Sequence, residues 1–137
     1  MTQNNTGVNY KPVSEKEQWL AAQIVDIAIC IHKALGPGLL ESVYEKCFCY
    51  ELSKRNIPFE RQKTVQLQYD KIIIDEGLRI DILIDKLLVV ELKVHEYYHP
   101  VWEAQVLSYL KLNNNRLGFI LNFNVPLMKE GIKRMIV

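Results

Sequence analysis

The segment from Arg79 to Val94 most constrains the fold of this chain, because it sets charged groups into a strongly apolar strand pattern. It reads RIDILIDKLLVVELKV, with Asp81, Glu91 and Lys93 among isoleucine, leucine and valine. Side chains on a strand alternate between faces with a period of two, so Glu91 and Lys93 point the same way. Ionised groups on a buried strand are costly unless they are paired or bind a metal. The segment therefore predicts buried strands that carry a polar site.

The loop between the two strands decides whether Asp81 and Glu91 share a face. Opposed residues of an antiparallel pair have a constant sum of residue numbers, so pairing 81 with 91 requires a loop centred on Lys86. A two-residue turn at Asp85-Lys86 would place Glu91 on the opposite face. We therefore predict an odd-length loop, Asp85 to Leu87, or a bulge between these strands.

The remaining pattern predicts an α+β domain with a central mixed sheet flanked by helices. Ser14 and Glu17 form a capping-box pattern before the first helix, and Gly36-Pro37-Gly38 ends it. The expected order is α-α-β-β-β-α-β. Apolar periodicity predicts helices over 14–35, 39–56 and 101–112, strands over 61–69, 72–85, 87–94 and 117–123, and a last strand or helical turn over 131–137. The run 72–85 is interrupted at Glu76-Gly77.

Length and composition set limits on the class of protein. The chain has 137 residues, which fits a single domain over 14–137 after a tail, 1–13, that we expect to be disordered. Its net charge of +1 gives no global basic field for nucleic acid. No apolar run approaches the ~20 residues of a membrane span, and the polar N-terminus lacks a signal-peptide core. Three cysteines give no disulfide framework. We therefore expect a cytoplasmic protein without a membrane partner.

Asp81, Glu91 and Lys93 are the first candidate site. Two carboxylates can hold Mg²⁺ or Mn²⁺, and a lysine can orient or help to deprotonate a water that attacks a phosphodiester. The alternative is a structural ion pair at a sheet edge, which the same residues would also form.

Two helices supply further candidates. Gln105 and Tyr109 lie four residues apart on the helix after the Lys93 strand, so they face one way. They suit contact with the lysine, the water or a phosphate, although a packed tyrosine ring beside a glutamine is the alternative. Glu41 lies in the first turn of the second helix, where an acid suits the helix dipole. It is also placed to be a further metal carboxylate, with Tyr44 one turn later.

Arg79 and His99 are candidates for binding the substrate. Arg79 precedes Asp81 by two residues and shares its face, where it could pair with Glu41 or hold a phosphate. His95 and His99 flank the exit of the Lys93 strand, and their spacing proposes no zinc site.

Together these residues resemble the GxxExxY proteins, a group within the PD-(D/E)XK nuclease superfamily. The name motif stands as GLLESVY over residues 38–44, and the strand motif as Arg79-x-Asp81 followed by Glu91-x-Lys93. The helix motif stands as Ala104-Gln105 and then Tyr109-Leu110-Lys111, with Asn122-Phe123 matching the last core strand. The resemblance covers about residues 20–137.

The resemblance implies a restriction-endonuclease-like core and assigns roles to the residues. Asp81 and Glu91 would bind the metal, Lys93 would handle the water, and Glu41 would assist from its helix as a metal carboxylate. Gln105 would complete the catalytic set. Contacts with the substrate are expected from Tyr109, Arg79, Tyr44 and His99.

The chain departs from the expected pattern at two positions. Trp102 stands where a histidine is expected, so a histidine contact with substrate is lost or passes to His99. The Asp70-Lys71 turn lacks an expected glycine, which should alter only a hairpin.

The resulting hypothesis is a Mg²⁺-dependent nuclease that cuts DNA, with RNA as the second choice, in DNA repair or defence. A domain this small is expected to gain substrate surface as a homodimer or with a protein partner. The alternatives are a non-catalytic module that binds nucleic acid or protein, and a regulator whose partner completes the site.

Overall fold

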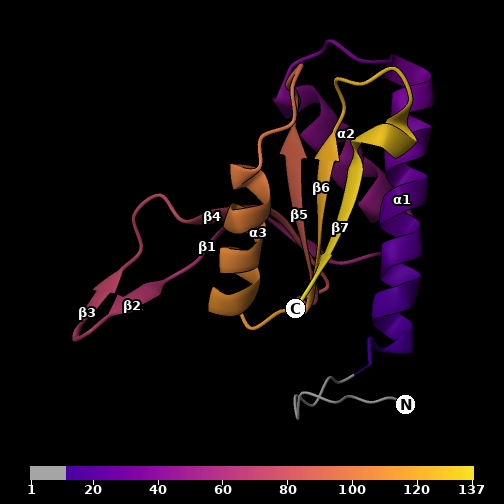
Figure 1. The fold of residues 1–137 in the computed structure, drawn as a ribbon. Coiled ribbons are helices and arrows are strands. Elements are labelled where there is room, and N and C mark those ends of the chain that lie inside the picture. Colours follow the sequence, from indigo (N-terminus) through magenta and orange to yellow (C-terminus); the bar gives the residue numbers. More distant parts are fainter. Residues whose placement is uncertain (1–11) are drawn as a thin grey trace, which may run out of the picture.

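The structure, a computed structural model, describes residues 12–137 and forms an α+β fold (Figure 1). The predicted tail, residues 1–13, lies outside the described residues except for its last two. The helices are α1 (Glu15–Leu35), α2 (Glu41–Lys54) and α3 (Val101–Leu112), with a short 3-10 helix η1 (Met128–Gly131). The strands are β1 (Phe59–Thr64), β2 (Leu67–Tyr69), β3 (Ile72–Ile74), β4 (Arg79–Ile84), β5 (Leu88–Lys93), β6 (Leu117–Asn122) and β7 (Ile132–Ile136).

A mixed five-stranded sheet forms the centre, in the order β1-β4-β5-β6-β7. The β5–β6 pair is parallel, because α3 carries the chain from the end of one strand to the start of the other. The pairs β1–β4, β4–β5 and β6–β7 are antiparallel. This confirms the mixed sheet predicted from the element order.

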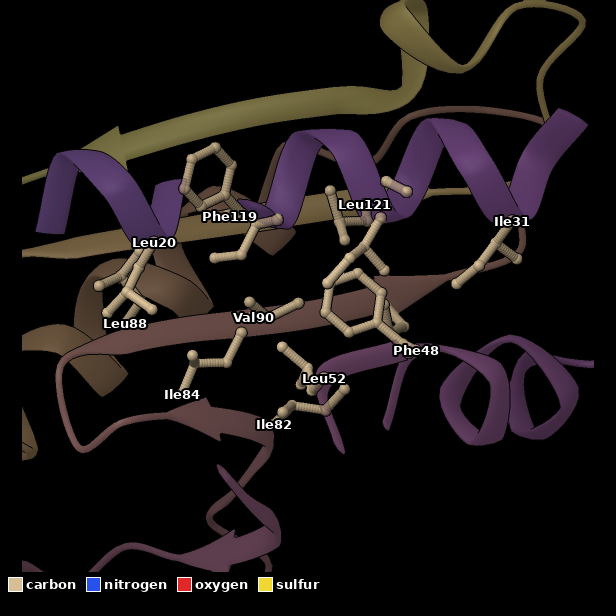
Figure 2. Close-up of a cluster of buried hydrophobic side chains, with 14 of the residues drawn as sticks. Leu20, Ile31, Phe48, Leu52, Ile82, Ile84, Leu88, Val90, Phe119 and Leu121 are labelled. Carbon is tan, nitrogen blue, oxygen red and sulfur yellow. The ribbon is translucent and has the colours of Figure 1, made fainter. Parts of the chain in front are cut away.

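Helices cover both faces of the sheet and create two hydrophobic clusters. α1 and α2 lie on one face and α3 on the other (Figure 1). Figure 2 shows the larger cluster, in which helix and strand side chains interdigitate. Its labelled members are Leu20 and Ile31 of α1, Phe48 and Leu52 of α2, and Ile82, Ile84, Leu88, Val90, Phe119 and Leu121 of the sheet.

The start of α1 has the predicted capping box. The hydroxyl of Ser14 accepts the Glu17 N–H at 3.1 Å, and the Glu17 carboxylate accepts the Ser14 N–H at 2.9 Å. Gly36 ends the helix with φ of 71°, a left-handed value that glycine adopts without steric cost. Among the helices of residues 12–137, none is both long and apolar enough to cross a membrane.

One predicted strand is divided unexpectedly in the structure, since the expected strand 61–69 splits into β1 and β2. The run 72–85 divides into β3 and β4 around Glu76-Gly77, which confirms the interruption predicted there. β2 and β3 form a separate hairpin that projects from the body of the fold (Figure 1). Unbroken alternation through Val65, Leu67 and Tyr69 concealed the point where the chain leaves the sheet. The last segment is strand β7, paired with β6, and not a helical turn.

The β4–β5 loop has the predicted odd length. Ile84 pairs with Leu88, which leaves Asp85, Lys86 and Leu87 as the connection. Asp85 and Lys86 have φ of 50° and 59°, and the Leu87 N–H donates to the Ile84 carbonyl at 2.9 Å, so two left-handed residues form a tight turn within this loop. Asp81 and Glu91 are therefore opposed on the same face of the sheet.

Candidate active site

Regular strand pairing is interrupted on both sides of Asp81. The β4–β5 register runs from Ile84–Leu88 to Ile82–Val90, and the next opposed pair would be Asp81 and Glu91. On the other side, the β1–β4 register pairs residues 61 with 82 and 63 with 80, which sets Gln62 opposite Asp81. Gln62 has φ of 50°, unusual for a strand residue. Strained backbone of this kind clusters at functional sites, so the break is a reason to look for one here.

The two carboxylates replace the missing strand pairing with hydrogen bonds of their own. Glu91 Oε2 accepts the backbone N–H of Asp81 at 2.7 Å. Asp81 Oδ2 accepts the backbone N–H of Leu92 at 2.9 Å. Each acid is therefore anchored through one oxygen to the opposite strand, which holds the pair together at the strand break.

Burial and mutual repulsion make this carboxylate pair costly to ionise. Burial first, then the negative charges of Asp81 and Glu41, raises the pKa of Glu91 to about 8, although the Asp81 N–H and Lys93 lower it. Burial also raises the pKa of Asp81, against the lowering effects of the Leu92 N–H, Lys93 and the Gln62 side chain. The side chain of Glu91 is buried, at 3% exposure. Strongly shifted acids in one buried pair are typical of a functional site.

Lys93 lies next to this pair and also contacts α3. Its Nζ donates to Gln105 Oε1 at 3.5 Å and lies 5.5 Å from the centre of the Trp102 ring. Its positive charge lowers the pKa values of Asp81, Glu91 and Glu41. The structure thus brings the three residues of the strand motif together at one place.

Gln105 and Tyr109 face the site together from α3. Tyr109 is buried, and burial together with the charge of Glu91 raises its pKa, while hydrogen bonding with the Arg79 backbone and the Gln105 side chain lowers it. Gln105 is exposed and reaches Lys93. The glutamine thus links Lys93 to Tyr109.

The first turns of α2 bring acids to the other side of the site. Burial, followed by the charge of Asp81, raises the pKa of Glu41. Glu45, one turn later, is buried and accepts from Arg61 Nε at 2.8 Å and from Gln62 Nε2 at 3.1 Å. Its charge acts on both Asp81 and Glu41.

The sequence analysis missed both Glu45 and Gln62. The i, i+4 spacing of Glu41 and Glu45 on one helix face was available as a signal for the first. Nothing in the local sequence marks Gln62, whose role depends on the strand register.

Tyr44, for which contact with substrate is predicted, is buried in the structure. Its side chain is fully buried and stacks on Phe123, with ring centres 4.4 Å apart. Its hydroxyl donates to the Gly36 carbonyl and accepts the Leu39 N–H at 3.2 Å. The tyrosine of the name motif therefore holds the loop that precedes Glu41.

A comparison with models of known protein families finds a match for this chain. A family model described as the PD-(D/E)XK nuclease superfamily matches residues 18–135, which is most of the chain. The chain belongs to the PD-(D/E)XK nuclease superfamily. No curated protein and no solved structure gives a match. Superfamily members are generally nucleases that use divalent metal ions, and the mixed sheet flanked by helices agrees with their restriction-endonuclease-like fold.

The acids of this superfamily member fit a small divalent ion. Mg²⁺ prefers oxygen ligands and is often held by only one or two carboxylates with several waters. Asp81 and Glu91 each use one oxygen for a backbone N–H, which leaves the second oxygen of each for an ion. Within residues 12–137, no three acid, histidine or cysteine side chains are gathered as ligands for one ion. Glu41 therefore stands within electrostatic range of the pair and not in a ligand cluster with it.

Arg79, His99 and Trp102 complete the placement of the predicted residues. Arg79 is exposed at the start of β4, and among the ion pairs of residues 12–137 it makes none with Glu41. Trp102, the departure from the expected histidine, is buried beside Lys93 and has His99 at 6.0 Å between ring centres. Trp102 thus packs beside Lys93, and His99, which is exposed, lies against the Trp102 ring.

Proposed function

We propose that this chain is a Mg²⁺-dependent nuclease that hydrolyses phosphodiester bonds of DNA. The observation that carries the proposal is the meeting of Asp81, Glu91 and Lys93 at the break in β4–β5 pairing, in a member of a nuclease superfamily. An ionic structural pair at a sheet edge would explain the lysine but not two acids whose charges repel each other in a buried position. Superfamily membership supplies the class of reaction, and the site supplies the residues.

The metal would be held by Asp81 and Glu91, with the Glu41 carboxylate supporting the charge of the ion from the α2 side. Such an ion polarises the phosphoryl oxygen and lowers the pKa of a bound water. The chain's own contribution begins with the anchored carboxylates, which are held by backbone N–H groups and need no reorganisation.

Lys93 and its helix partner act on the water and the phosphate. The Lys93 ammonium orients the attacking water and offsets the negative charge that develops on the phosphate. Gln105 fixes the lysine through its Oε1, and Tyr109 fixes Gln105. Arg79, exposed at the mouth of the site, binds a phosphate of the substrate with its guanidinium fork.

The name motif supports a finer assignment to the GxxExxY group. Gly38, Glu41 and Tyr44 stand at the spacing of the motif in the sequence, and the Tyr44 hydroxyl bonds the loop that leads to Glu41. We further propose a cytoplasmic enzyme of DNA repair or defence that works as a homodimer or with a protein partner, since one small domain covers little DNA.

Cleavage of labelled DNA tests the proposal. Single-stranded, double-stranded and branched DNA, and RNA as comparison, are incubated with Mg²⁺, Mn²⁺ or EDTA. We expect metal-dependent cutting of DNA by the wild type and at least a hundredfold loss in Lys93→Ala and Asp81→Asn, since each of these effects contributes about 10²-fold or more. Lys133→Ala, an exposed lysine on the edge strand β7, is the matched control and should cut normally.

Two results would contradict the proposal that this site is a nuclease active site. Absence of cutting together with absence of Mn²⁺ binding by calorimetry would favour the non-catalytic binding module. Cutting that survives unchanged in both variants would show that the activity does not belong to this site.

A further inference from the structure

Aromatic rings gather in the loop between β5 and α3. Trp102 is surrounded by His95, Tyr98 and His99, whose ring centres lie 5.2, 5.1 and 6.0 Å from its own. Tyr97 lies in the same loop. These five residues are called the ring cluster below. Trp102 alone is buried, at 5% exposure, while Tyr97 and Tyr98 are 79% and 45% exposed.

The ring cluster is anchored to the sheet at its start. The side chain of Asn122 accepts the His95 N–H at 3.2 Å and donates to the His95 carbonyl at 3.0 Å. The Phe123 N–H bonds the Lys93 carbonyl at 3.0 Å. These bonds continue the parallel pairing beyond the end of β5. The start of the loop is therefore held on the sheet, close to the strand that carries Lys93.

Further contacts hold the ring cluster beside the proposed site. Lys93 Nζ lies 5.5 Å from the Trp102 ring centre, so the ring cluster adjoins the residue that would handle the water. The Tyr98 hydroxyl donates to Glu103 Oε2 at 2.7 Å, which fixes the ring of Tyr98 against α3. A molecule that rests on the exposed rings would therefore lie next to a phosphate bound at Lys93.

The charge of this region indicates which part of a nucleic acid it would contact. Residues 94–110 contain Glu96 and Glu103 but neither lysine nor arginine. These carboxylates disfavour a phosphate backbone over the loop itself, while the cation beside the ring cluster is Lys93, 5.5 Å from the Trp102 ring centre, which the proposed site uses for the phosphate. The exposed rings of the loop therefore suit the face of a base, since stacking on aromatic side chains tolerates any base.

We propose that the ring cluster stacks an unpaired nucleobase next to the scissile phosphate, so that the substrate is single-stranded DNA. Tyr97 and Tyr98 provide the exposed rings, and Trp102 packs against the ring of Tyr98. In a duplex the bases are stacked on each other and their faces are covered, so this contact is lost. The inference rests on the proposed function for the position of the phosphate.

Binding without cleavage tests the inference separately from the nuclease activity. The probe is a fluorescein-labelled oligo-dT of 16 nucleotides, followed by anisotropy in EDTA and again in Ca²⁺, beside a labelled duplex of the same length. We expect the wild type to prefer the single strand and Tyr97→Ala to weaken its binding by about 5- to 100-fold, as for loss of one stacked base. Tyr97→Phe keeps the ring and should retain the affinity of the wild type. Tyr69→Ala, an equally exposed tyrosine on the β2–β3 hairpin, is the matched control and should bind as the wild type does.

Tryptophan fluorescence gives a second readout at the ring cluster itself. The chain has two tryptophans, Trp19 on α1 and Trp102, so Trp19→Phe leaves Trp102 as the single reporter. Oligo-dT should quench this emission in Trp19→Phe and fail to do so once Tyr97→Ala is added at the same oligonucleotide concentration.

Several results would overturn the inference. Equal binding of single strand and duplex would be one, and unchanged binding in Tyr97→Ala would be another. A change in oligomeric state in Tyr97→Ala without a change in DNA binding would show that the exposed rings form a protein interface. Stacking on the ring cluster without cutting in the cleavage assay would instead remove the proposed nuclease and leave this binding site standing. Cutting of duplex alone by the wild type would leave the nuclease and remove the single-stranded substrate.

Discussion

Asp81 and Glu91 each bind the other's strand: the Glu91 carboxylate accepts the Asp81 N–H at 2.7 Å, and the Asp81 carboxylate accepts the Leu92 N–H at 2.9 Å. An ordinary antiparallel pair would satisfy these backbone groups with carbonyl oxygens. Here the strands are joined through acids, so the two charged groups become part of the sheet. Stability and the proposed chemistry therefore depend on the same pair.

Glu91→Gln should make the protein less sensitive to pH. The folded pKa of Glu91 is about 8, above the ordinary value of 4.5, so its folding contribution is full below pH 4.5 and falls as pH rises towards 8. Each unit of such a shift corresponds to about 1.4 kcal/mol. Glutamine has no proton to lose and keeps an oxygen for the Asp81 N–H. Thermal unfolding in EDTA should show the wild type losing Tm relative to Glu91→Gln between pH 5 and 8.

The control for this measurement is Glu96→Gln, an exposed acid in the loop after β5. It should follow the pH dependence of the wild type. Parallel curves for the wild type and Glu91→Gln would contradict the idea that a buried acid at this position retains its proton in the folded protein.

Loss of metal affinity should be larger when Asp81 on β4 is changed than when Glu41 on α2 is changed. Asp81 and Glu91 are held face to face, whereas Glu41 lies within electrostatic range of them but in no ligand cluster with them. We expect Asp81→Asn to remove Mn²⁺ binding in calorimetry, and Glu41→Gln to weaken it by about tenfold, in the range of residues that support metal ligands. Glu130→Gln on the 3-10 helix is the control. Equal loss in Asp81→Asn and Glu41→Gln would instead make Glu41 a full ligand.

Gln62 offers a test of the strained backbone opposite Asp81. Its φ of 50° costs an L-residue about 1–2 kcal/mol, and its side chain bonds Glu45 and supports Asp81. Gln62→Gly relieves the backbone, while Gln62→Ala keeps the strain, and both lose the amide. We expect Gln62→Gly to unfold at a higher temperature than Gln62→Ala, with Mn²⁺ affinity reduced equally in the two. A difference in affinity between the variants would show that the backbone, and not the amide, positions Asp81.

Most of the fold followed from local pattern, and the odd β4–β5 loop followed from the requirement that two acids share a face. The split of the expected strand 61–69 at Val65 needed the register of β1 against β4, which no local alternation reports, whereas Glu76-Gly77 marked the break within 72–85 in the sequence itself. Gln62 was missed for the same reason. The substrate contact predicted for Tyr44 stays a prediction, because a motif does not tell which way a side chain points, and here the ring is buried against Phe123.

Tyr44→Phe distinguishes the structural role of this tyrosine from contact with substrate. The variant keeps the stacking on Phe123 but removes the hydroxyl that bonds Gly36 and Leu39, and a hydrogen bond of this kind contributes a net ~0.5–1.5 kcal/mol to stability. Because these residues lead into Glu41, we expect a lower Tm and a higher Mg²⁺ concentration for half-maximal cutting. Binding of oligo-dT in EDTA should stay at the wild-type level, as in the exposed control Tyr50→Phe. Weaker DNA binding in EDTA with unchanged Mg²⁺ dependence would return Tyr44 to the substrate-binding set.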